Sequence, residues 1–161
     1  LCNQRYEPIR NRTFRSHAWN CLTKRVQLAK DSAAPVVEYA NQFTLPTDCL
    51  RVLKVHNGTT DSIASSIDYA VEGRKIKTDE GTVFLVYIAK ITDPNEYDTY
   101  LVEALAAAIA ADIAYAITNN ATLSNNYQKL ADERLREARF IDATENSLGT
   151  IESNEFTDAR L

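Results

Sequence analysis

The side chains that most often carry out chemistry in proteins are sparse in this chain of 161 residues. Its two histidines, His17 and His56, stand far apart, and neither falls in the H-x-x-x-H or H-E-x-x-H spacing of a metal site. The sequence also lacks the G-x-S-x-G, Walker A and dinucleotide-binding glycine patterns. We therefore expect a protein that is not an enzyme and that has no catalytic residue, metal site or cofactor.

Cysteine and carboxylate side chains give the same indication. Cys2, Cys21 and Cys49 are odd in number and widely spaced, which argues against a disulfide framework and predicts reduced, buried thiols. Glu96 and Asp98 resemble a catalytic pair, but both precede a predicted helix, where acidic residues interact favourably with the helix dipole. We interpret them as structural.

The segment that organises the chain is the apolar stretch 97–118, which we expect to form a long helix and the axis of a small bundle. Its large apolar residues recur every four positions and form one ridge: Leu101, Leu105, Ile109, Ile113 and Ile117. Alanines fill most of the remaining surface, so other helices can approach closely.

Two carboxylates interrupt this apolar helix. Glu103 and Asp112 would each cost roughly 3 kcal/mol at the centre of a bilayer, so we expect no membrane insertion. Charges amid so much apolar surface usually line a subunit boundary or pair with a basic side chain. Together with Ala107 and Ala110, we take Glu103 and Asp112 as candidate subunit-interface residues.

Helix signals and hydrophobic periods predict the other elements. Asp93, Pro94 and Glu96 form an N-terminal capping signal, so the long helix is predicted over 94–118. Ser124 can cap a second helix over 125–144 that pairs antiparallel with the first. A third helix is predicted over 2–16, in which Pro8 either introduces a kink or lies in the first turn.

The region 20–91 is predicted to be mainly antiparallel sheet. Residues 17–29 fit either a helix or a strand, whereas 36–45 alternates with period two and predicts a strand. The segment 50–56 has apolar residues on both faces, which suggests an interior strand. A hairpin over 67–78 and a strand covered on both sides over 82–91 follow. The fold class is therefore α+β, a helical bundle with an inserted sheet region.

Charge is distributed unevenly along the chain. Residues 1 to 30 carry seven Lys or Arg side chains and Glu7, a balance of +6, so the net charge of −4 leaves −10 for residues 31 to 161. The basic segment could bind nucleic acid, meet an acidic protein, or be a solvated surface.

The last residues, 146–161, show no periodicity and are expected to be an extended tail outside a single domain over 1–145. Four apolar residues in this tail are spaced like anchors for a partner protein: Leu148, Ile151, Phe156 and Leu161.

Six short segments together resemble the head-to-tail adaptors of short-tailed bacteriophages, the tail tubular protein A family. They are RSHAWN (15–20), KRVQLA (24–29), LPTDCLRVLKV (45–55), YAVEGRKIKTD (69–79), YIAKITDPNEYD (87–98) and the alanine-rich helix. They occur in the family's order, although Ala18 stands where such sequences usually have proline and Cys21 where an aromatic residue is common.

The resemblance implies a structural virion protein, assembled in the host cytoplasm, that forms a ring of twelve copies between the portal protein and the tail nozzle protein. It implies that DNA passes through the lumen without specific binding, that the helices meet the portal, and that the sheet points toward the tail. It also implies that residues 20–29 form a strand and that another helix precedes Leu1. The alternative is an intracellular regulatory or small-ligand-binding α+β domain whose sheet forms a pocket.

Overall fold

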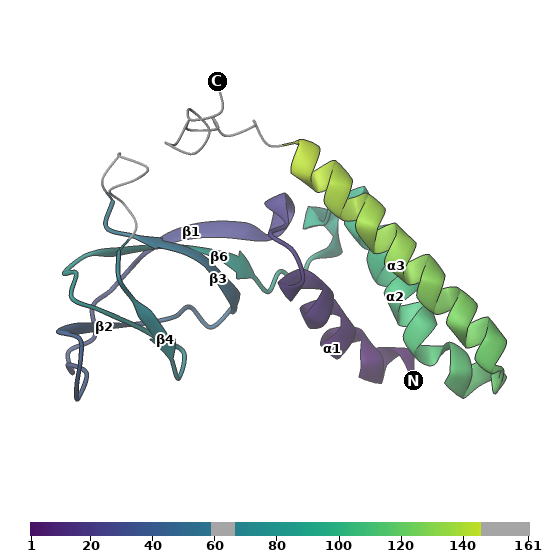
Figure 1. Ribbon diagram of the computed structural model, residues 1–161, viewed down its shortest axis with the longest axis horizontal. Helices are drawn as coiled ribbons and strands as arrows, with labels where there is room; N and C mark the ends of the chain where they lie inside the picture. Colours follow the sequence, from purple (N-terminus) through teal and green to yellow (C-terminus); the bar gives the residue numbers. More distant parts are fainter. Residues whose placement is uncertain (59–66, 146–161) are drawn as a thin grey trace, which may run out of the picture.

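The helices and the strands occupy opposite ends of the molecule. The computed structural model describes residues 1–58 and 67–145, and in that part of the chain three α-helices lie at one end and two small antiparallel sheets at the other (Figure 1). This confirms the predicted α+β class, with a long alanine-rich helix, the helix after it, an N-terminal helix and a sheet region inserted between them.

The first two helices differ from their predicted forms mainly in how they begin. α1 spans Cys2–Arg15, with Pro8 inside it rather than in its first turn. α2 spans Thr99–Thr118 and begins after Asp98, whose carboxylate accepts from the backbone N–H groups of Tyr100 and Leu101. The predicted start at 94 was therefore wrong.

Tyr97 explains the late start of α2. Asp93 caps only the single 3₁₀ turn η2, Pro94–Glu96, because the Tyr97 backbone that follows is extended. The Tyr97 hydroxyl donates to the Ile91 carbonyl at 2.8 Å, and its ring packs edge-on against Phe14 with the centroids 5.3 Å apart. These contacts hold the chain out of a helical path at Tyr97 and Asp98, both of which have extended backbone.

α3 spans Ala121–Thr144 and begins one turn before the predicted residue 125. Asn119 adopts a left-handed conformation with φ 48°, which ends α2. The side chain of Asn120 then accepts from the Leu123 backbone N–H at 3.0 Å and caps α3, so the predicted cap Ser124 lies inside the helix.

The first sheet has the order β1-β6-β3, in which β1 is Thr23–Leu28, β6 is Val83–Ala89 and β3 is Cys49–His56. The second has the order β2-β5-β4, in which β2 is Asn41–Thr44, β5 is Lys75–Thr78 and β4 is Ala70–Glu72. The hairpin of β4 and β5 agrees with prediction, and β1 falls within the strand over 20–29 that the resemblance implied. β6 is apolar on both faces as predicted, but Phe84 and Val86 on one face are only half-buried, so the expected cover on both sides is incomplete. A 3₁₀ turn, η1 at Asn20–Leu22, precedes β1.

The predicted strand over 36–45 is only half formed. Asn41–Thr44 pairs with β5, but Val36 is 97% exposed and Val37 is 66% exposed. Glu38 has φ 73°, a conformation that no strand residue adopts, so the alternating residues before Asn41 lie in a loop.

β3 is an edge strand, so its predicted interior position was wrong. Its register against β6 shifts between Cys49 and Arg51 and again between Val52 and Lys54, which makes Leu50 and Leu53 the extra residues of two β-bulges. Both are half-buried against the core. The bulges therefore explain why apolar residues seem to alternate onto both faces of β3. They do so although β3 has a neighbouring strand on one side only.

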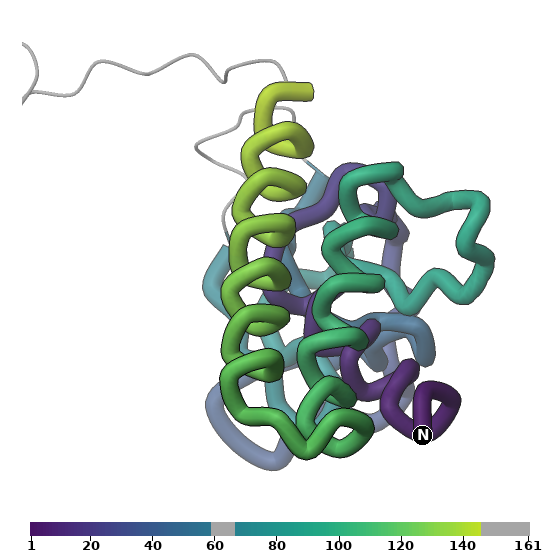
Figure 2. The backbone as a smooth tube through the Cα atoms, turned by 90° about the vertical axis from the view of Figure 1, so that its right-hand side faces the viewer, coloured from purple at the N-terminus to yellow at the C-terminus, as the bar shows by residue number. Residues whose placement is uncertain are grey.

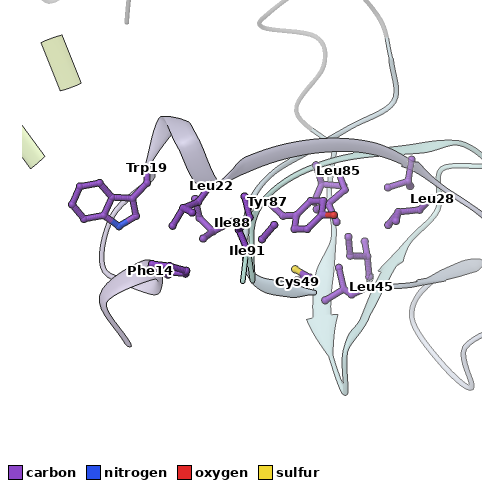
Figure 3. Close-up of a cluster of buried hydrophobic side chains, with 14 of the residues drawn as sticks. Phe14, Trp19, Leu22, Leu28, Leu45, Cys49, Leu85, Tyr87, Ile88 and Ile91 are labelled. Atoms are coloured by element: carbon purple, nitrogen blue, oxygen red, sulfur yellow. The ribbon is translucent and has the colours of Figure 1, made fainter. Parts of the chain in front are cut away.

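One hydrophobic core connects the two ends of the molecule (Figure 3). Leu85 and Tyr87 of β6 face the second sheet together with Leu45, whereas Ile88 on the other side of the strand lies toward Leu22 and Phe14. Trp19 is buried, and its indole N–H donates to the Thr13 carbonyl at 3.1 Å. Alanine at position 18 is therefore compatible with a fully packed tryptophan.

Candidate functional site

The hairpin of α2 and α3 is the part of the molecule that best fits a contact surface. The two helices lie side by side along their lengths, and α1 packs against α2 on the other side (Figure 2). Alanines form the seam between α2 and α3, because Ala104, Ala114, Ala131 and Ala138 are all at most 5% exposed. The alanine-rich sequence thus gives close helix packing, as predicted.

Large apolar residues are concentrated on the outside of this hairpin. Eight of the thirteen exposed large apolar residues in the described part of the chain belong to it: Tyr100, Val102, Tyr115, Ile117, Leu123, Tyr127, Leu130 and Phe140. Ile117 is 66% exposed and Phe140 is 68% exposed. These residues extend along the hairpin, from Ile117 and Leu123 at the turn to Phe140 near the end of α3, and so many exposed apolar side chains on one pair of helices favour an interaction surface.

Four of these residues define the hairpin tip. Tyr115 and Ile117 lie in the last turns of α2, and Leu123 and Tyr127 lie in the first turns of α3. The predicted ridge is therefore buried only near the sheet, where Leu101 and Leu105 lie in the core, and it ends in exposed Ile117. The tip projects beyond the core that covers the start of α2.

The predicted interface residues Glu103 and Asp112 both have partners within the chain. Arg5 of α1 binds Asp112 through two hydrogen bonds, Nε to Oδ2 at 2.6 Å and Nη2 to Oδ1 at 2.8 Å. These contacts lower the pKa of Asp112. Glu103 Oε2 lies 3.8 Å from Arg134 Nη1 on α3, with both side chains about half exposed. Of the two roles expected for Glu103 and Asp112, the structure therefore supports pairing with a basic side chain.

Ala107 and Ala110, the other two predicted interface residues, are half-buried. They lie on α2 between the buried seam and the exposed outer surface. A larger side chain at either position therefore has open space on one side.

A cleft of about 330 Å³ separates α1 from α3 along one side of α2. Its floor is alanine, from Ala104, Ala108, Ala111 and Ala131, and its rim is polar, from Arg12, Asp112, Gln128 and Asp132. Its volume lies at the lower end of the range of small-molecule pockets, about 300 to 1,000 Å³. It adjoins the helical surface described above and not the sheet.

The sheet-proximal end of α3 is fixed by the buried carboxylate of Asp142. Its Oδ1 accepts from the Asn20 backbone N–H at 2.9 Å, and its Oδ2 lies 3.0 Å from His17 Nε2. The Asn20 side chain donates in turn to the Asp142 carbonyl at 2.7 Å. The RSHAWN segment thus anchors the hairpin to the start of β1.

The thiols only partly match the predicted buried, reduced state. Within residues 1–58 and 67–145 all three cysteines are free, but Cys2 is exposed, Cys21 is half-buried and Cys49 is buried. Burial raises the pKa of the Cys21 and Cys49 thiols, so neither is an activated nucleophile. The described residues contain no group of three potential metal ligands among His, Cys, Asp and Glu.

Length and composition alone would allow one helix in the described part of the chain, Thr99–Thr118, to span a membrane. Here that helix packs against α1 and α3, and Asp112 on its surface is ion-paired. The four predicted tail contacts, Leu148, Ile151, Phe156 and Leu161, lie outside the described residues.

Sequence reasoning missed three features of the helical region: the exposed Phe140, the Arg5–Asp112 pair and the Asp142 anchor. Phe140 carried a usable signal, since the apolar stripe of its helix runs through Tyr127, Leu130, Ala131, Leu135, Ala138 and Ile141 and leaves Phe140 outside. Arg5 as the partner of Asp112, and the Asp142 anchor, gave no signal because their partners lie 107 and 122 residues away in the sequence. No protein-family model matches this chain, and no curated protein sequence matches it.

Proposed function

We propose that this protein is a head-to-tail adaptor of a short-tailed bacteriophage, a virion protein without catalytic activity. In this proposal about twelve copies form a ring between the portal and the tail nozzle, and DNA passes through its lumen without specific binding. The protein assembles in the host cytoplasm and inserts into no membrane. The sequence resemblance supplies the family, and the two-ended architecture is compatible with it.

One observation carries the proposal: the exposed apolar surface of the helical hairpin. Tyr115 is 55% exposed, and it lies with Ile117 at a tip that points away from the sheets. Burial of such side chains stabilises a complex by about 25 cal/mol per Å² of apolar area. An isolated subunit, in which they are exposed to water, lacks this stabilisation. A ring that seats each hairpin against the portal or a neighbouring subunit would cover this surface, and repetition around the ring would add avidity.

The alternative function, a small-ligand-binding domain, receives less support. It requires a pocket formed by the sheet and its hairpin, whereas the cleft of about 330 Å³ lies among the helices.

A binding experiment with point variants tests the proposal. Purified chain is mixed with portal rings of the same phage, and bound protein is measured by sedimentation. Ile117→Ser and Phe140→Ser should each reduce binding at least tenfold while the melting temperature stays within about 2 °C of wild type, because both side chains are mostly exposed. Val36→Ser is the matched control, since it removes a 97% exposed apolar residue far from the hairpin. Equal binding by all three variants would contradict the assigned surface.

A further inference from the structure

The outer face of the first sheet carries an unusual arrangement of side chains. Directly paired residues on neighbouring strands share a face, and the register places three rows across β1, β6 and β3. They are Thr23, Ile88 and Arg51; then Arg25, Val86 and Lys54; then Gln27, Phe84 and His56. The two bulges in β3 create this order, because they bring both of its basic residues and His56 to one side.

The last two rows form an open trough. Ile88 in the first row is fully buried toward the helices, whereas Arg25, Gln27 and Lys54 are exposed and the β6 residues between them are half-buried. All three α-helices lie toward the other end of the molecule (Figure 1). Adjacent strands are about 4.8 Å apart, so the cations of β1 and β3 stand roughly 10 Å apart across an apolar floor.

The cations of this face have no carboxylate partner among the described residues. Lys24 and Lys75 elsewhere in the sheets pair with Asp48 at 3.4 Å and Asp31 at 2.8 Å. No such pair involves Arg25, Arg51 or Lys54 in residues 1–58 and 67–145, and Arg51 donates only to the Arg15 carbonyl at 3.1 Å. At the border of this face, the acidic Glu145 lines a shallow pocket with Thr23 and Arg25.

Two flat rings lie in the third row of the trough. The His56 and Phe84 rings are stacked with centroids 5.5 Å apart and an interplanar angle of 16°. Gly58, two residues after His56, approaches the Phe84 ring closely, since a Cβ there would lie 2.5 Å from ring carbon Cε2. The half-buried imidazole is therefore presented on a rigid aromatic support.

We propose that this trough binds single-stranded nucleic acid without sequence preference. Arg25 on one side and Lys54 on the other contact phosphates, while a base stacks on the His56 ring that Phe84 supports. A floor one strand wide between these two cations fits one nucleic-acid strand, and a planar stacking platform serves a base better than an acidic peptide. The proposal is independent of the ring assembly and concerns the opposite end of the molecule.

Fluorescence anisotropy with a labelled oligothymidylate of about 15 nucleotides tests the proposal on the full chain. Each lost phosphate contact should lower the salt slope of log K by about 0.7, which is roughly a fivefold loss near 0.1 M salt. Arg25→Gln with Lys54→Gln should therefore weaken binding about 25-fold and reduce the slope by about 1.4. His56→Ala should weaken binding at least about fivefold with the slope unchanged.

The control double variant, Lys129→Gln with Arg136→Gln, removes two exposed charges of the same sign from α3 and should bind like wild type. Oligouridylate should bind as oligothymidylate does, and a duplex of the same length should bind more weakly. Equal losses in the trough and control variants would overturn the proposal, as would a polyglutamate peptide or the duplex binding as tightly as the single strand.

Discussion

Replacing Ala138 by leucine tests how tightly the helical hairpin is packed. Ala138 is 1% exposed and belongs to the core, so three more carbon atoms at this position must displace buried neighbours. Overpacking of this kind costs roughly 1 to 3 kcal/mol. For a chain of this length, 1 kcal/mol lowers the melting temperature by about 2 to 4 °C, so a loss of about 2 to 12 °C is expected.

The assay is thermal unfolding followed by circular dichroism at 222 nm, with urea unfolding as a second measure of stability. Ala143→Leu on the same helix is the matched control, because Ala143 is exposed and leucine there should leave the melting temperature within about 2 °C. If the Ala138→Leu and Ala143→Leu variants have the same melting temperature, the close packing of α2 on α3 is refuted.

Three further substitutions test individual contacts. Asp142→Ala removes the acceptor of a buried backbone N–H and should lower the unfolding free energy by about 1 to 3 kcal/mol in urea titrations. Gly58→Ala, at φ 89° and with its Cβ against the Phe84 ring, should lower the melting temperature by several degrees. The pKa of Asp112 is lowered by hydrogen bonding to Arg5, so the stability it contributes is present above its unfolded pKa of about 3.9 and is lost as pH falls through the folded value. Wild type should therefore lose more stability than Asp112→Asn between about pH 5 and pH 2.

Each of these variants has a control in the chain. Asp142→Asn keeps the carbonyl acceptor and should recover part of the loss. Gly73→Ala has positive φ but nothing within 4 Å of the added Cβ, so it should cost less than Gly58→Ala. Asp132→Asn removes an exposed carboxylate from α3 and should leave the acid sensitivity intact. Any control that matches its test variant would disprove the assigned contact.

Local signals were sufficient for most of the fold. The four-residue period of α2, the doubly apolar run of β6 and the turn at Gly73 depend on residues close in sequence, and each prediction was confirmed. The predicted starts of the two long helices were wrong because a neighbouring residue, rather than the expected cap, determined where each helix begins. Tyr97 interrupts the helix that Asp93 begins, and Asn120 takes over the capping role expected of Ser124.

Features that depend on distant residues could not be predicted. The bulges at Leu50 and Leu53 reverse the alternation of β3, so its basic residues appeared to lie on mixed faces until the pairing with β6 was known. Asp112 was predicted as an interface residue because its partner, Arg5, belongs to a helix whose packing the sequence does not reveal. In the sequence, the apolar residues of the hairpin surface form part of an apolar ridge. We expected the helical bundle to bury this ridge, so its exposed end at Ile117 was not predicted.

Assembly on the portal tests the central claim most directly. Purified chain is added in excess to portal rings of the same phage, and the complex is measured by size-exclusion chromatography with multi-angle light scattering. An adaptor should add about twelve subunits of 18.1 kDa to each ring, and Ile117→Ser should abolish that increase. A chain that elutes separately at the mass of a monomer, with the portal mass unchanged, would contradict the account.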